Sequence, residues 1–356
     1  MQTLEEAPLD LDAPIVNDAP DIFARAKVLQ VVESGTKDAD GTPQEYQKLE
    51  LEIVSGDEKG KKITIDHGGL FAIQEYQKVQ AGDVVIITKP AGGIKEDFYY
   101  ITDKYRLPNV LILVAVFFAL AIFFGRKRGL TSILGLVFTT LVIFRFLIPR
   151  IAAGHDPLVA CIIAALLICF CSLYLSHGFN RRTTIALIST LLTLGAAIII
   201  DIVFVRFAKL AGTGTEEAFY LQLGAGTIDL RGVLLGGILI GVLGVLDDIT
   251  TAQAAVIEEI HTANPTVSLA QLYKSGLSVG REHIASLVNT LVLAYVGVSF
   301  PLLLLYSMQK STQLWIMLNS NFIAEELVRT LVGSCVLVLA VPLTTLLASW
   351  WFTRRK

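Results

Sequence analysis

Charged residues are scarce in this chain. Only 17% of its 356 residues are Asp, Glu, Lys or Arg, whereas about 25% is usual for a soluble domain. Hydrophobic residues make up 53% of the sequence. A water-soluble enzyme of this length needs more polar surface, so that class is excluded and a membrane protein is expected.

Cysteine is also rare, and it occurs only within apolar runs, at positions 161, 169, 171 and 335. Neither a disulfide framework nor a zinc knuckle is therefore expected. The sequence has no HExxH, Walker A or CxxC motif. No cofactor is identified from these motifs, although binding of a divalent cation stays open.

The charges that are present divide the chain into two parts. Residues 1–106 carry 12 basic and 20 acidic residues, a net charge of −8, and the remainder has a net charge of +5. An acidic head repels phosphate backbones, so nucleic acid is not an expected partner. Residues 1–21 are acidic and poor in apolar residues, and we predict that they are disordered.

Residues 22–106 are expected to form a small all-β domain. Alternating or β-rich runs are separated by glycine-containing turns, with a helix predicted at 70–79 between the third and fourth runs. Five strands with such an insertion predict an OB-like barrel, although other small β folds share the pattern. The runs lie at 23–33, 46–54, 61–66, 83–89 and 97–104.

Residues 107–356 are expected to form an α-helical polytopic membrane domain. A helix needs about 20 apolar residues to cross the hydrocarbon core of a bilayer, and about seven stretches qualify. The lipid bilayer is therefore an expected partner. The predicted spans are 107–124, 130–148, 158–175, 184–205, 232–246, 284–306 and 327–352.

Basic residues predict the orientation of these spans. With seven spans, clusters at 126–128, 181–182 and 354–356 fall on one side, which the positive-inside rule makes cytoplasmic. The C-terminus would then be cytoplasmic and the β domain extracytoplasmic. Because residues 1–21 lack the features of a signal peptide, this orientation predicts an apolar helix upstream of residue 1. The alternative is that the β domain is cytoplasmic and the positive-inside rule fails for this chain.

The densest group of candidate functional residues begins in the fifth span. No proline interrupts residues 158–264, so one helix is predicted from about residue 232 to residue 261. Gly237, Gly241 and Gly244 share a stripe with Asp248, and small residues in a membrane helix allow a neighbour to approach closely. We expect this helix-packing seam to shield Asp248 more than Asp247.

The sixth span is the expected neighbour of that seam. Polar side chains deep in a span usually face the bundle interior, and Asn289 lies about two turns inside the apolar run. Arg281 is the predicted charge partner of the two aspartates, and the alternative is that these aspartates simply end the span at the headgroups. The candidate ion- or substrate-binding residues are Asp247, Asp248, Thr251, Glu282, His283 and Asn289.

Several stretches resemble the YibE/F family of bacterial multi-pass membrane proteins. They are residues 177–183, residues 229–232 running to the Asp247-Asp248 pair, residues 280–285 with the sequence Gly-Arg-Glu-His-Ile-Ala, and residues 288–295. The resemblance covers most of residues 100–350. It implies a bacterial plasma-membrane protein with an extracytoplasmic β domain, and it carries over no catalytic or binding residue.

Three functions remain open at this point. Carboxylates beside a glycine-lined seam favour a transporter or permease for an ion or small solute. The same oxygen and imidazole groups would also suit a membrane-embedded hydrolase that depends on a divalent metal. A non-catalytic assembly protein, whose β domain binds an envelope partner or whose chains form a homo-oligomer, is the third alternative.

Overall fold

The computed structural model describes residues 21–39, 42–69, 72–90, 98–224, 228–308 and 313–354. The predicted disorder of residues 1–21 falls almost entirely outside these ranges. The described chain divides into two units, residues 1–117 and 118–356, so the predicted boundary near residue 106 precedes the structural one.

The first unit contains a five-stranded antiparallel sheet, as the alternating runs predict. Its strands pair in the order β3-β2-β1-β4-β5, so β1 pairs with β2 along one edge and with β4 along the other, and the β1–β2 ladder contains two register shifts. In place of the predicted helix at 70–79, the described residues form a single 3-10 turn, η1. The bounds are β1 Ile22–Ala39, β2 Thr42–Ile53, β3 Lys62–His67, η1 Glu75–Gln77, β4 Val84–Lys89 and β5 Tyr100–Lys104.

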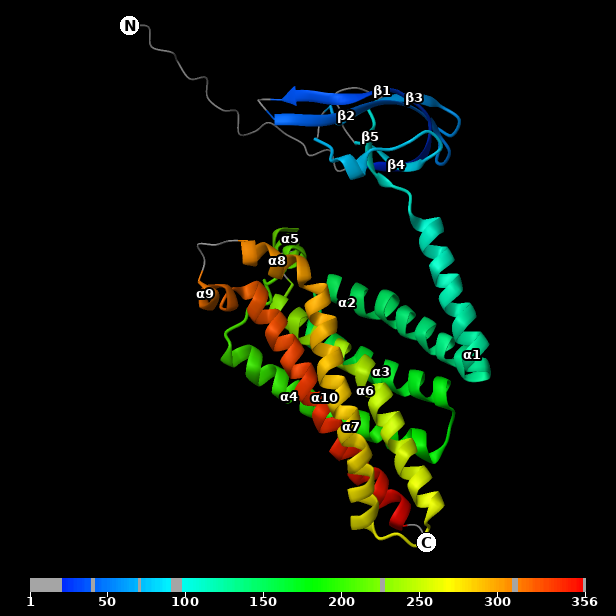
Figure 1. Cartoon of the computed structure of the whole chain (residues 1–356), viewed down its shortest axis with the longest axis vertical. Helices are drawn as coiled ribbons and strands as arrows, with labels where there is room; N and C mark the ends of the chain where they lie inside the picture. Colours follow the sequence, from blue (N-terminus) through cyan, green and yellow to red (C-terminus); the bar gives the residue numbers. More distant parts are fainter. Residues whose placement is uncertain are drawn as a thin grey trace. The chain divides into compact units, whose positions relative to one another are not determined.

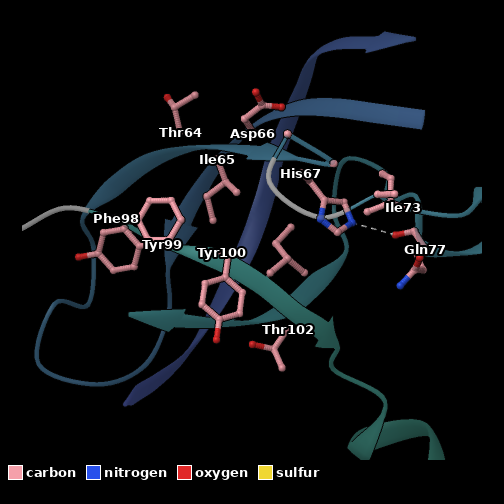
Figure 2. A pocket seen from close by; sticks show the side chains of 14 residues that line it. Thr64, Ile65, Asp66, His67, Ile73, Gln77, Phe98, Tyr99, Tyr100 and Thr102 are labelled. Atoms are coloured by element: carbon pink, nitrogen blue, oxygen red, sulfur yellow. Dashed lines mark hydrogen bonds between the residues drawn. The ribbon is translucent and has the colours of Figure 1, made fainter. Parts of the chain in front are cut away.

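The curled sheet encloses a small apolar core that includes Leu49, Leu51 and Ile87. Among the described residues the strand pairing includes no β3–β5 ladder. A cleft of about 580 Å³ lies beside these two strand edges, with His67 on one side and Tyr100 on the other (Figure 2). The Nε2 atom of His67 lies 3.3 Å from the carbonyl oxygen of Gln77.

The second part of the chain is helical. Five helices of the described residues are long and apolar enough to cross a membrane, and a sixth is added if the bent pair α7–α8 counts as one span. This number is lower than the predicted seven, because residues 107–152 count as one continuous helical stretch. The bounds are α1 Leu107–Val142, η2 Ile143–Leu147, α2 Ile148–Ala152, α3 Pro157–His177, α4 Arg181–Phe207, α5 Glu216–Gly224, α6 Leu230–Ala263, α7 Leu269–Val298, α8 Phe300–Met308, α9 Leu314–Leu318 and α10 Asn321–Arg354.

The long first stretch is broken at Arg126, within the predicted basic turn. Arg126 has φ 50° and ψ −129°, which is not a helical conformation. A Cβ atom at Gly129 would overlap the carbonyl oxygen of Ala121, so only glycine allows the chain to approach the preceding turn so closely here. The helical arms on either side of Arg126 are each long enough for a span.

The sixth candidate span is bent by 65° between α7 and α8. Pro301 lies at the start of α8, and a proline there cannot donate the backbone hydrogen bond that would continue α7. By contrast, α10 runs through Pro342 without a break. The predicted single helix at 232–261 is confirmed as α6.

Helices α4, α6 and α10 pack against one another, while α3 covers one side of α6 and α7 packs on α6 and α10 (Figure 1). Since α6 and α10 each have 34 residues, each is about 50 Å long. That length exceeds the roughly 30 Å of a hydrocarbon core. Both helices therefore extend beyond a membrane at one end or at both.

Candidate functional site

Polar side chains line the contact between α4, α6 and α10, where apolar packing would be expected. On α4 the buried face includes Thr190, Thr193, Ala197 and Asp201, which recur at helical spacing of three or four residues. Hydroxyl and amide groups face it from the other two helices. The buried polar residues of this seam are Ser189, Thr190, Thr193 and Asp201 on α4, Thr250 and Gln253 on α6, and Thr344, Thr345 and Ser349 on α10.

A hydroxyl pair connects α4 to α6 in this seam. The Oγ1 atoms of Thr190 and Thr250 are 2.8 Å apart, and both side chains are fully buried. Thr190 also lies 3.0 Å from the carbonyl oxygen of Ala186, to which its hydroxyl can donate. Thr250 Oγ1 likewise lies 3.4 Å from the Asp247 carbonyl oxygen, so either hydroxyl of the pair can donate to the other.

The side-chain amide of Gln253, one turn further along α6, connects this helix to α7 and to α10. The Nε2 atom of Gln253 donates to the Gly276 carbonyl oxygen of α7 at 2.9 Å and to Thr345 Oγ1 of α10 at 2.8 Å. A Cβ atom at Gly276 would overlap Ile257, so glycine is needed for this close approach. Gln253 therefore fixes the positions of three helices at once.

Asp247 lies on α6 near the hydroxyl pair. Its side chain is half-buried, and its Oδ1 atom is shielded from solvent without a hydrogen-bond partner. Leaving a carboxylate oxygen unpaired in a low-dielectric interior is costly, so this atom marks a place for a proton or a cation.

Asp201 is the most deeply buried aspartate of the bundle. Only 3% of the residue is exposed, and its Oδ1 atom has no hydrogen-bond partner among the described residues. The charge of Arg329 on α10 acts on it, although the two do not form an ion pair within 4 Å. The Nε atom of Arg329 is also buried and unpaired, and its terminal nitrogen lies 3.7 Å from Glu326.

The loop after α4 is held by another buried carboxylate. Glu325 is only 3% exposed and accepts a hydrogen bond from the Gly212 backbone N–H at 3.0 Å. A Cβ atom at Gly214 would overlap its other oxygen. Because Glu325 is satisfied by backbone donors, its role here is to hold the loop.

A family model described as YibE/F-like protein matches residues 113–354, which is more than half of the chain and includes every helix of the polar seam. The chain belongs to the YibE/F-like family. Searches of curated proteins and of solved structures found no significant match.

The second group of predicted site residues does not assemble in this YibE/F-like chain. Arg281, Glu282 and Asn289 are exposed, His283 is half-buried, and Arg281 forms no described ion pair with Asp247 or Asp248. No group of three or more His, Cys, Asp or Glu side chains that could hold a metal ion occurs among the described residues. The hydroxyl of Thr251 donates to the Asp247 carbonyl oxygen at 2.8 Å, within its own helix.

The predicted close contact along Gly237, Gly241 and Gly244 is not formed within the described part of the chain. A Cβ atom at Gly237 or Gly244 would have no described atom within 4 Å, and one at Gly241 would meet only the Tyr295 hydroxyl, at 3.8 Å. Because this stripe is open, Asp248 is exposed rather than shielded. The glycines that do pack tightly are Gly232 and Gly236, which face α3.

Asp201 is the functional candidate that sequence reasoning missed. A position six residues from the end of α4 indicates a side chain that reaches the membrane surface, but the structure buries it instead. The signal that could have found it is the helical spacing from Thr190 and Thr193, which aligns it with a run of small and hydroxyl residues.

Proposed function

We propose that this YibE/F-like protein is a permease that moves an ion or small solute through the polar seam of α4, α6 and α10, coupled to a proton or another cation. The observation that carries the proposal is Asp201, a carboxylate with an unpaired buried oxygen in a span. Ionisable residues in spans are expensive and commonly mark ion pathways and proton relays.

The groups along the seam support this function. Asp201 and the Thr190–Thr250 pair are separated by 11 residues of α4, or about 16 Å, with Thr193 between them. Asp247 follows near the far end. A small cation or a proton moving along this line would meet side-chain oxygens at Asp201, at Thr193 and at the Thr190–Thr250 pair, whereas apolar helix packing would offer none.

The proposed topology has seven spans: the two arms of α1, α3, α4, α6, the α7–α8 pair and α10. Seven spans place the basic turns at residues 126–128 and 181–182 and the C-terminal end on one side, which is the cytoplasm by the positive-inside rule. The β domain, which we propose to be an OB-like barrel, is then extracytoplasmic. The membrane is the bacterial plasma membrane, as the family resemblance implies.

The second candidate function is a scaffold that binds an envelope protein through its β domain. The observation that favours it is the cleft beside β3 and β5, which is large enough to hold a small ligand or part of a peptide (Figure 2). A scaffold would bind a partner without moving solute, so a flux measurement separates the two functions.

The test uses the full chain in proteoliposomes under an imposed pH or sodium gradient. Dyes inside the vesicles report both ions, and a low-molecular-mass cell extract outside supplies solutes. We expect protein-dependent dissipation of one gradient, at least about tenfold slower in Asp201→Asn. Asp248→Asn is the matched control, because Asp248 is exposed, and it should stay within about twofold of the native rate.

Folding of both variants is checked by their elution volume and by their unfolding temperature in detergent. Asn has nearly the size of Asp, so the substitution removes ionisation with little change in packing. If the native protein dissipates neither gradient, the transport proposal is wrong. If Asp201→Asn transports at the native rate, this carboxylate is not part of the pathway.

A further inference from the structure

A cavity of about 420 Å³ lies where the start of α3, the end of α4 and the start of α6 meet. Small-molecule sites commonly enclose about 300–1,000 Å³, so this volume is sufficient for a small solute. Its wall includes Ile202 and Val205 of α4, next to Asp201 in the sequence. Four charged side chains surround it, Asp156, Arg206, Asp229 and Arg231.

The two aspartates of this cavity are already committed to local structure. Asp156 caps α3, with its Oδ1 atom 2.9 Å from the Val159 N–H. Asp229 caps α6, with its Oδ1 atom 3.1 Å from the Arg231 N–H. Each carboxylate satisfies the backbone donors at a helix start and offsets the partial positive charge there.

The two arginines are not neutralised in the same way. Neither Arg206 nor Arg231 forms an ion pair with a carboxylate among the described residues. The Nε atom of Arg231 donates to the Leu210 carbonyl oxygen at 3.0 Å, which orients its guanidinium group and leaves the terminal nitrogens available. The side chain of Arg206 has no hydrogen-bond partner in the described part of the chain.

The local charge balance favours an anion. The two aspartates and two arginines cancel formally, two helix starts add about +0.5 elementary charge each, and the end of α4 contributes about −0.5, which leaves a small positive excess. Guanidinium groups bind phosphate and carboxylate oxygens with paired, directional hydrogen bonds. One oxygen of each aspartate accepts a helix-cap hydrogen bond, and the two arginines offer an incoming oxyanion their unpaired N–H donors.

We infer that this cavity is a binding site for an oxyanion, a phosphate or carboxylate group held by Arg206 and Arg231. As an entry site for a transported solute, it rests on the proposed permease function. The same chemistry is present in the headgroup phosphate of a lipid, since the cavity lies where several helices end. Oxyanion binding itself does not require transport and is measured separately.

The experiment uses the full chain, purified in a non-ionic detergent, and inorganic phosphate as the probe. Titration calorimetry measures its affinity for the native protein, for Arg206→Gln and for Arg150→Gln. Arg150 is the matched control, because it is exposed, lies at the end of α2 and does not line the cavity. We expect Arg206→Gln to weaken phosphate binding about tenfold or more and Arg150→Gln to leave it unchanged.

A second measurement identifies the source of the anion. Native mass spectrometry with a short-chain phosphatidylglycerol tests for a lipid headgroup, with the same two variants. Loss of lipid adducts in Arg206→Gln, with no binding of free phosphate, would identify the headgroup as the occupant of the oxyanion site. Arg206→Lys should retain part of the affinity, because it keeps the charge but loses the paired donors.

If neither phosphate nor lipid binding depends on Arg206, the oxyanion site is refuted. This result would leave the transport proposal intact if Asp201→Asn still abolishes flux. Conversely, oxyanion binding in a protein that dissipates no gradient would support the site and refute transport.

Discussion

The contact between α3 and α6 gives a direct test of which face of α6 is packed. Gly236 faces α3, and a Cβ atom there would overlap the Sγ atom of Cys161 and lie 3.0 Å from its Cβ. Its neighbour Gly237 has open space, with no described atom within 4 Å of a Cβ. Adjacent residues of one helix therefore provide a matched pair, Gly236→Ala and Gly237→Ala.

The two substitutions differ in packing alone. Each replaces glycine by alanine within α6, so each gains a similar helix propensity, about 1 kcal/mol. Only Gly236→Ala forces the Cys161 sulfur out of its position, and overpacking of this kind costs about 1–3 kcal/mol. We therefore expect the free energy of unfolding to be lower for Gly236→Ala than for Gly237→Ala by about 1–3 kcal/mol.

Thermal unfolding of the purified protein in detergent, followed by circular dichroism, measures the difference. A change of 1 kcal/mol shifts the midpoint of a domain this large by about 2–4 °C. The second substitution Cys161→Ala removes the sulfur but keeps the Cβ atom at 3.0 Å, so it should restore part of the stability of Gly236→Ala. The coupling in this double-mutant cycle attributes the loss to one contact.

Equal midpoints for Gly236→Ala and Gly237→Ala would refute this packing of α3 on α6. A loss in Gly236→Ala that Cys161→Ala does not recover would also count against the contact, because the cause would then lie elsewhere. Gly237→Ala as the less stable variant would favour the seam predicted from the sequence, packed against a second chain.

Three further predictions concern other parts of the chain. Gln253→Leu should lower the midpoint in detergent by the equivalent of about 1–3 kcal/mol, because it removes the two buried hydrogen bonds that join α6 to α7 and to α10. Thr345→Val should cost less, since Gln253 keeps its bond to the Gly276 carbonyl oxygen, and equal losses would contradict the reasoning. Burial lowers the pKa of His67, so the folded β domain favours the neutral imidazole and should lose stability as the pH falls below about 6.5. Hydrogen exchange of β3 in the full chain between pH 7 and pH 5 measures this loss of stability. His67→Gln should reduce the dependence of stability on pH, whereas an unchanged dependence would assign the loss to other groups. In intact cells, and in a background without native cysteines, an impermeant thiol reagent should label Lys59→Cys but not Arg126→Cys; the reverse pattern would invert the proposed topology.

In the β domain, the sequence pattern predicted the strands but not the conformation of the segment between the third and fourth strands. Alternation of apolar and polar residues fixes which side of each strand is buried, and the five runs correspond to the five strands. Between residues 70 and 79 the sequence favours a helix, but the described part forms only a 3-10 turn. A segment this short is marginal as a helix unless tertiary contacts support it, and propensity alone does not supply them.

Hydropathy located the helices of the membrane domain but could not assign their faces. Uninterrupted apolar length is enough to predict that residues 230–263 form a helix, and the absence of proline predicts its continuity. In lipid, however, the surface that packs and the surface that faces acyl chains are both apolar, so periodicity carries little information about direction. For this reason Gly237 and Gly236 could not be distinguished from the sequence, although only Gly236 is packed.

Residue types in the sequence therefore determined the β domain, the apolar spans and the presence of carboxylates within them. The tertiary structure alone decided that Asp201 is buried while Asp248 is exposed. The physical reason is that burial of a polar side chain in a bundle depends on which helices surround it. That arrangement is set by close contacts between residues far apart in the chain, such as Thr190 with Thr250 and Gln253 with Thr345.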